Sequence, residues 1–258
     1  MHVLIRPWGH MHFEDEGPKD APAILFANSL GTDLRMWQGV TQGLPQRCIR
    51  FDKRGHGLSA TPAQKWTVED LADDVVALLD HLGIKTAVIA GCSVGGMVAQ
   101  ALGIHHPTRA RALILSNTAA KIGTSESWQS RIDAVEADGI ASIADIILDR
   151  WFPKTFRVSD APLPWRTMLL RADPIGYVQT CRALSRADLR AGLAHLDLPV
   201  LLLAGAEDLS TPPALVTETA ALIRGAKLVE LAGSGHIPAI DAPAQVASLI
   251  AGFVGGLS

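Results

Sequence analysis

Residues 86–107 read TAVIAGCSVGGMVAQALGIHHP, and this stretch decides the fold. Apolar residues 87–90 predict a buried strand, the clustered glycines predict a tight turn, and the apolar residues that follow predict a buried helix ending near His106. The stretch carries no Asp, Glu, Lys or Arg and is long enough to suggest a membrane helix. Because glycines lie at its centre and Ser93 and Gln100 interrupt it, we expect a strand, a turn and a helix, and no membrane span.

The turn, Gly91-Cys-Ser93-Val94-Gly95, is a G-x-S-x-G pattern between the predicted strand and the predicted helix. In that setting the serine lies on a sharp, strained turn that holds its Oγ out at the edge of the sheet. The N–H of Val94, at the start of the helix, would point toward a developing oxyanion. Ser93 is therefore the candidate nucleophile and Val94 a candidate oxyanion donor. The alternative is a glycine-rich turn with an incidental serine.

A serine hydroxyl is a poor nucleophile unless a base takes its proton. Among nine histidines, we select His236 as that base. It lies in the loop Gly233-Ser-Gly-His236, just after a predicted strand that ends at Leu231, where a ring can reach across the sheet edge. The alternative is a loop histidine that only bonds to backbone. The remaining candidates end a helix, lie on the outer side of one, or have no motif around them: His10, His12, His81, His105, His106 and His195.

An acid must hold the histidine in the required tautomer and stabilise its charged form. Asp208 follows a predicted strand ending at Ala204-Gly205, so its carboxylate would lie at the carboxyl end of the sheet. Its neighbour Glu207 is the competing candidate, and a helix-capping role is the other alternative for Asp208. The resulting order of nucleophile, acid and base along the chain matches the α/β-hydrolase order.

Working outward, apolar strands alternate with helices, which predicts a mostly parallel sheet with helices on both faces. One helix is especially clear, because Thr67 and Asp70 form a start signal and Gly83 an end signal. The predicted strands are 2–6, 11–14, 23–28, 47–51, 87–90, 112–115, 199–204 and 227–231. The predicted helices begin near residues 34, 67, 94 and 243.

Residues 121–190 break this rhythm with helical pieces separated by prolines and with three of the six tryptophans. We interpret them as a helical cap inserted over the carboxyl edge of the sheet. The core is then formed by residues 1–120 and 191–258. The alternative is a surface excursion with no role in substrate choice.

Composition excludes several other functions. The chain has 258 residues and a net charge of −3, with 23 basic and 26 acidic residues well mixed, unlike the basic field that nucleic-acid binding requires. Three separated cysteines, Cys48, Cys92 and Cys181, indicate free thiols in a reducing compartment. The first seven residues hold no apolar stretch of signal-peptide length, so we expect a cytoplasmic protein. The sequence leaves a homo-oligomer open.

The second oxyanion donor should come from the loop that follows the third strand, Asn28-Ser-Leu-Gly-Thr32. We select the amide of Leu30. The segment Asp52-Lys-Arg-Gly-His-Gly-Leu-Ser59 is interpreted as structural, with glycines for a tight loop and Arg54 bound to nearby carbonyls or acids.

Taken together, these motifs resemble the α/β-hydrolase superfamily across nearly the whole chain. More narrowly, Asn28-Ser-Leu-Gly-Thr-Asp-Leu-x-Met-Trp37, Ser116-Asn-Thr-Ala-Ala-Lys-Ile-Gly123 and Arg150-Trp-Phe152 look like those of 3-oxoadipate enol-lactonases of the β-ketoadipate pathway. The turn around Trp8-Gly9 departs from the usual Asn-Gly turn of the family. The resemblance implies an α/β-hydrolase fold with an eight-stranded sheet and a helical cap.

The resemblance also implies hydrolysis of 3-oxoadipate enol-lactone to 3-oxoadipate through an acyl-enzyme, with no metal or organic cofactor. Since that small-molecule lactone carries a carboxylate, we expect a cation in the pocket. Arg131, beside Trp128, is the first candidate, with Trp151 as an apolar wall; the alternative for Arg131 is a solvated helix residue. The alternatives for the whole chain are a carboxylesterase or C–C bond hydrolase with the same three residues, or a non-catalytic ligand-binding relative. Dehalogenase and epoxide hydrolase chemistry is disfavoured, because those relatives place Asp where Ser93 stands.

Overall fold

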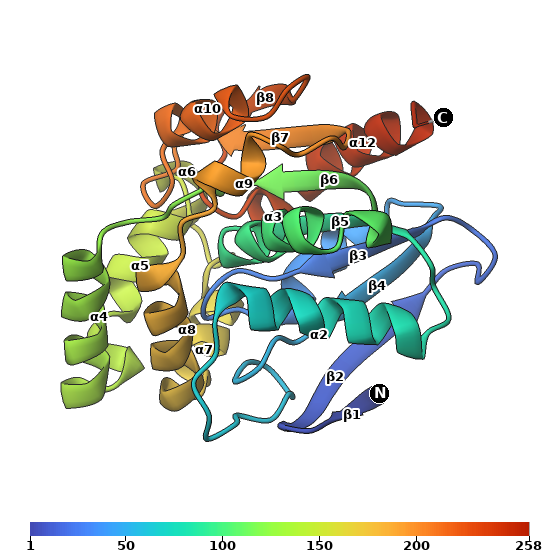
Figure 1. Ribbon diagram of the computed structural model, residues 1–258. Coiled ribbons are helices and arrows are strands. Elements are labelled where there is room, and N and C mark those ends of the chain that lie inside the picture. The colour runs from blue at the N-terminus through green and yellow to red at the C-terminus, as the bar shows by residue number, and fades with distance from the viewer. Residues whose placement is uncertain (258) are drawn as a thin grey trace.

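The computed structural model describes residues 1–257, which form one eight-stranded sheet with helices around it (Figure 1). The strand order is β1-β2-β4-β3-β5-β6-β7-β8. The first two strands pair antiparallel with each other, and β2 pairs antiparallel with β4; all the remaining neighbours are parallel. This arrangement confirms the predicted fold class.

The strands are β1 (His2–Arg6), β2 (Gly9–Glu16), β3 (Ala23–Ala27), β4 (Arg47–Phe51), β5 (Ala87–Cys92), β6 (Ala110–Ser116), β7 (Val200–Gly205) and β8 (Lys227–Leu231). The α-helices are α1 (Gln38–Thr41), α2 (Val68–His81), α3 (Val94–His105), α4 (Ser125–Asp138), α5 (Ala144–Trp151), α6 (Lys154–Arg157), α7 (Leu163–Leu170), α8 (Pro174–Arg186), α9 (Arg190–Leu193), α10 (Pro213–Ala221), α11 (Pro238–Asp241) and α12 (Pro243–Gly255). Short 3-10 turns are η1 (Leu34–Trp37), η2 (Pro107–Arg109) and η3 (Ile140–Ser142).

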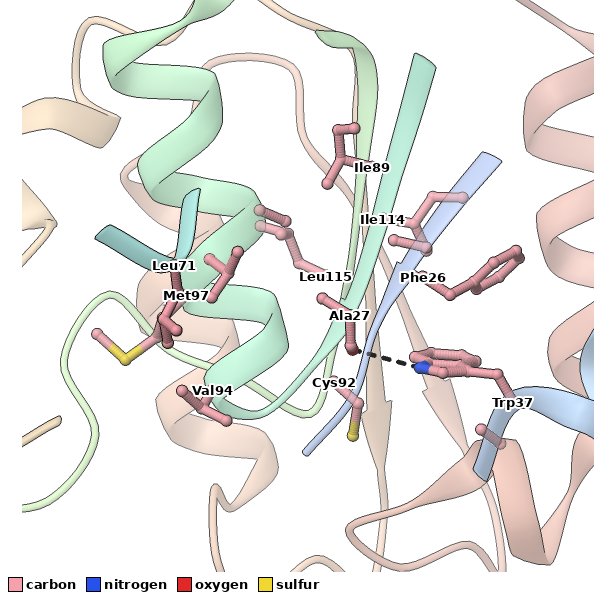
Figure 2. Close-up of a cluster of buried hydrophobic side chains, with 14 of the residues drawn as sticks. Phe26, Ala27, Trp37, Leu71, Ile89, Cys92, Val94, Met97, Ile114 and Leu115 are labelled. Atoms are coloured by element: carbon pink, nitrogen blue, oxygen red, sulfur yellow. Dashed lines mark hydrogen bonds between the residues drawn. The ribbon is translucent and has the colours of Figure 1, made fainter. Parts of the chain in front are cut away.

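The central strands are buried along their whole length, as expected for parallel strands covered on both faces. Figure 2 shows two of the layers: Met97 and Val94 of α3 lie on one side of the strands, and Trp37 lies on the other. There the indole of Trp37 packs on Phe26 at 5.1 Å between ring centres and donates to the Ala27 carbonyl at 3.3 Å. These contacts fix the carboxyl end of β3, where the loop of residues 28–32 begins.

Helices α4, α5, α7 and α8 lie together beyond the carboxyl end of the sheet, at the left of Figure 1. They follow β6 in the chain and fall within residues 121–190. Side chains of this segment line a cavity together with Ser93, which follows β5, and Ser210, which lies after β7.

Several predicted element boundaries shift in the structure. The second strand is longer than predicted, because it pairs with β1 on one side and with β4 on the other. The helix expected from Leu34 is a 3-10 turn followed by the single turn α1. By contrast, the start of α2 is as predicted. The Thr67 side chain accepts from the Asp70 N–H, and the Asp70 carboxylate accepts from the Thr67 N–H. Within residues 1–257, no helix has both the length and the apolar character that a bilayer crossing requires.

Candidate active site

Ser93 lies at the sharp turn between β5 and α3, with φ 57° and ψ −119°. A non-glycine residue adopts such angles only when its surroundings enforce them, at a cost of about 1–3 kcal/mol. The enforcement comes from close backbone packing: a Cβ on Gly91 would lie 2.0 Å from the Gly95 carbonyl oxygen, and one on Gly95 would lie 2.2 Å from that of Ala27. The two glycines of the pattern therefore allow β3, β5 and α3 to approach closely enough to hold Ser93 in this strained turn.

The backbone of Ser93 is firmly held. Its N–H donates to the Ser116 carbonyl at 3.0 Å, and its carbonyl accepts from the Thr118 hydroxyl at 2.7 Å. The side chain lines the same cavity as His236. Among residues 1–257 the structure forms no hydrogen bond between the Ser93 hydroxyl and the His236 ring; such contacts are often long in unliganded sites and tighten when substrate binds.

His236 and Asp208 are directly bonded, with His236 Nδ1 2.8 Å from Asp208 Oδ2. Both side chains are buried. Because an ionised carboxylate only accepts, this contact places a proton on Nδ1 and leaves Nε2 as the free acceptor of a neutral ring. Glu207, the competing acid, is exposed and makes no hydrogen bond with His236 in residues 1–257. The structure thus joins the predicted base to Asp208 rather than to Glu207.

The Asp208 carboxylate is satisfied from several sides. It accepts from the Ser210 N–H at 2.7 Å, from the Thr211 N–H at 3.0 Å and hydroxyl at 2.7 Å, and from Asn117 Nδ2 at 2.9 Å. Burial alone would raise the pKa of Asp208, but the neighbouring His236 and these hydrogen bonds outweigh it and lower the pKa. The carboxylate is therefore ionised at neutral pH and can stabilise a positive imidazole.

The backbone of the His236 loop is anchored at two further points. Asp241 accepts from the Gly235 N–H at 2.8 Å and from the Ser234 hydroxyl, and the His236 N–H donates to the Trp151 carbonyl at 2.8 Å. The second bond links the loop to the end of α5. Burial raises the pKa of Asp241 to about 6, against the lowering effect of those hydrogen bonds.

The cavity that Ser93 and His236 share has a volume of about 290 Å³ and extends under α4, α5 and α8. Of the residues predicted for the site, Leu30, Trp128, Arg131 and Trp151 also line it. The full lining is Ser29, Leu30, Ser93, Ile122, Gly123, Ser127, Trp128, Ser130, Arg131, Ala134, Ile143, Ile146, Ile147, Arg150, Trp151, Tyr177, Ser210 and His236.

This lining contains two arginines and no aspartate or glutamate. Neither Arg131 nor Arg150 forms an ion pair among residues 1–257. The Arg131 guanidinium lies over the Trp128 ring at 5.0 Å from its centre. Arg131 and Arg150 line the cavity together with Tyr177. Burial raises the pKa of the Tyr177 hydroxyl, and the charges of the two arginines oppose that rise. The side of the cavity formed by residues 121–190 is therefore positive.

The amides of the loop after β3 differ in how they are used. The N–H of Ser29 points to the Met36 sulfur at 3.3 Å, that of Gly31 donates to His56 Nε2 at 3.2 Å, and that of Thr32 bonds within the loop. Among the four N–H groups of residues 29–32, that of Leu30 is the one with no acceptor within the described chain. The Val94 N–H, at the first residue of α3, likewise has none there.

Several residues of this site were not predicted from the sequence. The sequence predicts no site role for Arg150 or Tyr177, because no local pattern indicates which face of a helix in residues 121–190 meets the cavity. Asn117 was also given no role. Its φ of 47° is a signal visible only in the backbone, and its amide bridges Asp208 and the Gly235 carbonyl.

A second cavity lies apart from these groups. A larger cavity, of about 680 Å³, is lined by residues of the N-terminal hairpin, of the loops at 31–35 and 56–58, and of α7, and it contains neither Ser93 nor His236. Across residues 1–257, no group of three His, Cys, Asp or Glu side chains is placed to hold a metal ion.

Comparisons with known proteins identify the family of this chain. The family model described as "Alpha/beta hydrolase family" matches residues 24–249. Among relatives, 3-oxoadipate enol-lactonase 2 of Acinetobacter baylyi is 40% identical over 77% of this chain and 76% of its own length. 3-Oxoadipate enol-lactonase 1 of the same organism is 36% identical over 92% of this chain and 90% of its own.

A solved structure, the enol-lactonase from Burkholderia xenovorans LB400, superimposes with a TM-score of 0.95 and 34% identity. The match covers 98% of this chain and all of the other. With the family model spanning most of the chain and these relatives matching over most of their length, the chain belongs to the alpha/beta hydrolase family and is a hydrolase.

Proposed function

We propose that this hydrolase opens 3-oxoadipate enol-lactone to 3-oxoadipate, with Ser93 as nucleophile, His236 as base and Asp208 as the orienting acid. The observation that carries the proposal is the composition of the cavity. It joins Ser93 and His236 to a cap surface with two arginines and no acid, which suits a small ester that bears a carboxylate. The names of the enol-lactonase relatives give the same substrate.

In the first step, Ser93 Oγ attacks the lactone carbonyl while its proton passes to His236 Nε2. The negative oxygen that forms accepts hydrogen bonds from the Leu30 and Val94 amides, whose N–H groups have no other acceptor in the described chain. The ring C–O bond then breaks, the enolate leaves, and the proton on His236 passes to it. The ring-opened substrate stays attached to Ser93 as an ester.

In the second step, water gives a proton to His236 and its hydroxide attacks the acyl carbon. The same two amides stabilise the second tetrahedral intermediate. Its collapse returns the proton to Ser93 Oγ and frees the new carboxylate, and the enol becomes the 3-oxo group. The ionised Asp208 stabilises the positive imidazole in both steps.

Substrate choice is assigned to residues 121–190, which we propose act as a cap on the core of residues 1–120 and 191–258. Arg131 and Arg150 bind the carboxylate, while Trp128 and Trp151 supply apolar walls. The cavity volume of about 290 Å³ is at the lower limit of about 300–1,000 Å³ for drug-sized ligands, which favours a small substrate. We assign the enzyme to the reducing cytoplasm, since its three cysteines are free and buried.

The test is turnover of synthetic 3-oxoadipate enol-lactone by the purified chain, compared with p-nitrophenyl esters and with ring-fission products that need C–C cleavage. We expect the lactone to give the highest kcat/KM, and Ser93→Ala to abolish its turnover. A higher kcat/KM for an uncharged ester or for C–C cleavage would overturn the substrate assignment.

A further inference from the structure

Lys53 is a buried cation outside the residues assigned so far. It follows β4, its residue is 2% exposed, and it forms no ion pair among residues 1–257. Within the described part of the chain, its ammonium makes a single hydrogen bond, to the Ser29 carbonyl oxygen at 2.6 Å. An ammonium placed in the interior without a paired carboxylate opposes folding, so its presence calls for a role other than stability.

The neighbouring charges are already engaged with other groups. Asp52 accepts from His12 Nδ1 at 2.8 Å and from the N–H of Leu34 at 2.8 Å, and Asp33 is paired with Arg35. The charged and titratable groups near Lys53 are Asp52, Asp33, the Cys92 thiol and His56. None of them takes the ammonium as a direct partner.

The carbonyl that Lys53 contacts belongs to the same peptide group as the Leu30 N–H. The bond is trans, so the carbonyl and the N–H point in opposite directions. Lys53 therefore lies on the carbonyl side of the Ser29–Leu30 peptide group, and the Leu30 N–H points to the opposite side. A cation on the oxygen draws electron density along the peptide and makes its N–H a stronger donor.

We propose that Lys53 is a positioning residue whose positive charge polarises and orients the Ser29–Leu30 peptide, so that the Leu30 N–H stabilises the oxyanion on the substrate. This inference rests on the proposed function in one respect, the use of Leu30 as an oxyanion donor. It does not depend on which ester is the substrate.

Further hydrogen bonds hold the Ser29–Leu30 peptide group in this orientation. The Ser29 carbonyl also accepts from the Thr32 hydroxyl at 2.9 Å, and the next N–H, of Gly31, donates to His56 Nε2. Burial and the charge of Lys53 lower the pKa of His56 well below its ordinary value. His56 is thus neutral, with Nδ1 donating to the Arg54 carbonyl at 3.1 Å and Nε2 free to accept.

The charge of Lys53 makes the mechanism pH-dependent. Burial lowers the pKa of Lys53 to about 7, against the raising effect of Asp52 and Asp33. The cation is present below that value and lost above it, so the rate should fall on the alkaline side.

The decisive variant is Lys53→Met, with Thr32→Val as a matched control that removes an uncharged donor to the same carbonyl, and Lys65→Met as an exposed control. The readouts are the rate at which a fluorophosphonate labels Ser93 and the kcat and KM for p-nitrophenyl acetate. Each is measured from about pH 5.5 to about 9.5, a range that brackets the pKa of about 7 for Lys53. Circular dichroism and thermal unfolding verify that each variant is folded.

We expect Lys53→Met to unfold at the same or a higher temperature than the wild type and to lose about tenfold in kcat and labelling rate, less than the 10²–10³ lost with a whole oxyanion donor. KM should change little, and the alkaline fall of the rate should disappear in this variant alone. A folded Lys53→Met protein with wild-type labelling rate and pH profile would overturn the inference.

These outcomes separate the inference from the substrate assignment. If the wild type fails to open the enol-lactone but Lys53→Met still slows the labelling of Ser93, the substrate is wrong and the role of Lys53 stands. If the wild type opens the lactone but Lys53→Met labels at the wild-type rate, the substrate stands and the role of Lys53 is refuted.

Discussion

Replacing Arg131 with methionine should weaken binding of the carboxylate-bearing lactone while leaving its uncharged methyl ester unaffected. Arg131 has no ion pair among the described residues, and its guanidinium lies over the Trp128 ring. Its charge is therefore available to a ligand in the cavity. Methionine keeps an apolar side chain against the indole, so the substitution removes the charge with little loss of packing.

The size of the effect follows from the exposure of the two cavity arginines. A hydrogen bond to a charged group contributes about 1.5–3 kcal/mol, which corresponds to a factor of about 10–150 in binding. Arg131 is half-buried and Arg150 is exposed. We therefore expect KM to rise about tenfold or more for Arg131→Met and less for Arg150→Met, whose effect added salt should weaken. In both variants kcat should change little.

The assay is steady-state hydrolysis of the enol-lactone and of its methyl ester, at low and at high salt. Arg171→Met is the matched control, because Arg171 lines the separate larger cavity and forms no ion pair among residues 1–257. An equal rise in KM for acid and ester would mean that the substitution disturbs the cap. An unchanged KM for the acid in Arg131→Met, Arg150→Met and the double variant would refute carboxylate binding by these residues.

Three further predictions concern the core. Asp208→Asn should lower kcat by about 10⁴, because the amide cannot hold His236 in the required tautomer, whereas Glu207→Gln should keep kcat near the wild-type value. Gly95→Ala should destabilise the fold by about 1–3 kcal/mol in urea unfolding, because its Cβ would lie 2.2 Å from a backbone oxygen of β3. Burial raises the pKa of Asp241 from 3.8 to about 6, so the wild type loses stability as pH rises from about 4 to about 6, and the loss is complete above that. Asp241→Asn should thus gain stability relative to the wild type as pH rises from 4 to 8, by at most about 3 kcal/mol, and a difference that is independent of pH would contradict this assignment.

Local sequence signals determine much of the fold and part of the site. The glycines around Ser93 and the reciprocal bonds of Thr67 and Asp70 are short-range features, and their residue types allow few other conformations. The positions of Asp208 and His236 follow from a topological rule, because groups after parallel strands meet at one edge of the sheet.

What sequence reasoning missed depends on distant parts of the chain. Arg150 and Tyr177 belong to cap helices, and only the packing of those helices over the sheet determines which side chains meet the cavity. Lys53 occurs in a segment that was interpreted as structural, and its sequence neighbours do not indicate that its ammonium would be buried against the Ser29 carbonyl. Such placements are set by tertiary contacts rather than by local propensity.

The most direct test of the central claim is rapid-quench mass spectrometry of the wild-type chain mixed with 3-oxoadipate enol-lactone. The account predicts a transient gain of one lactone mass, located on the peptide that contains Ser93 and absent from Ser93→Ala. Turnover of the lactone with Ser93 unmodified at every time point, or undiminished turnover by Ser93→Ala, would contradict it.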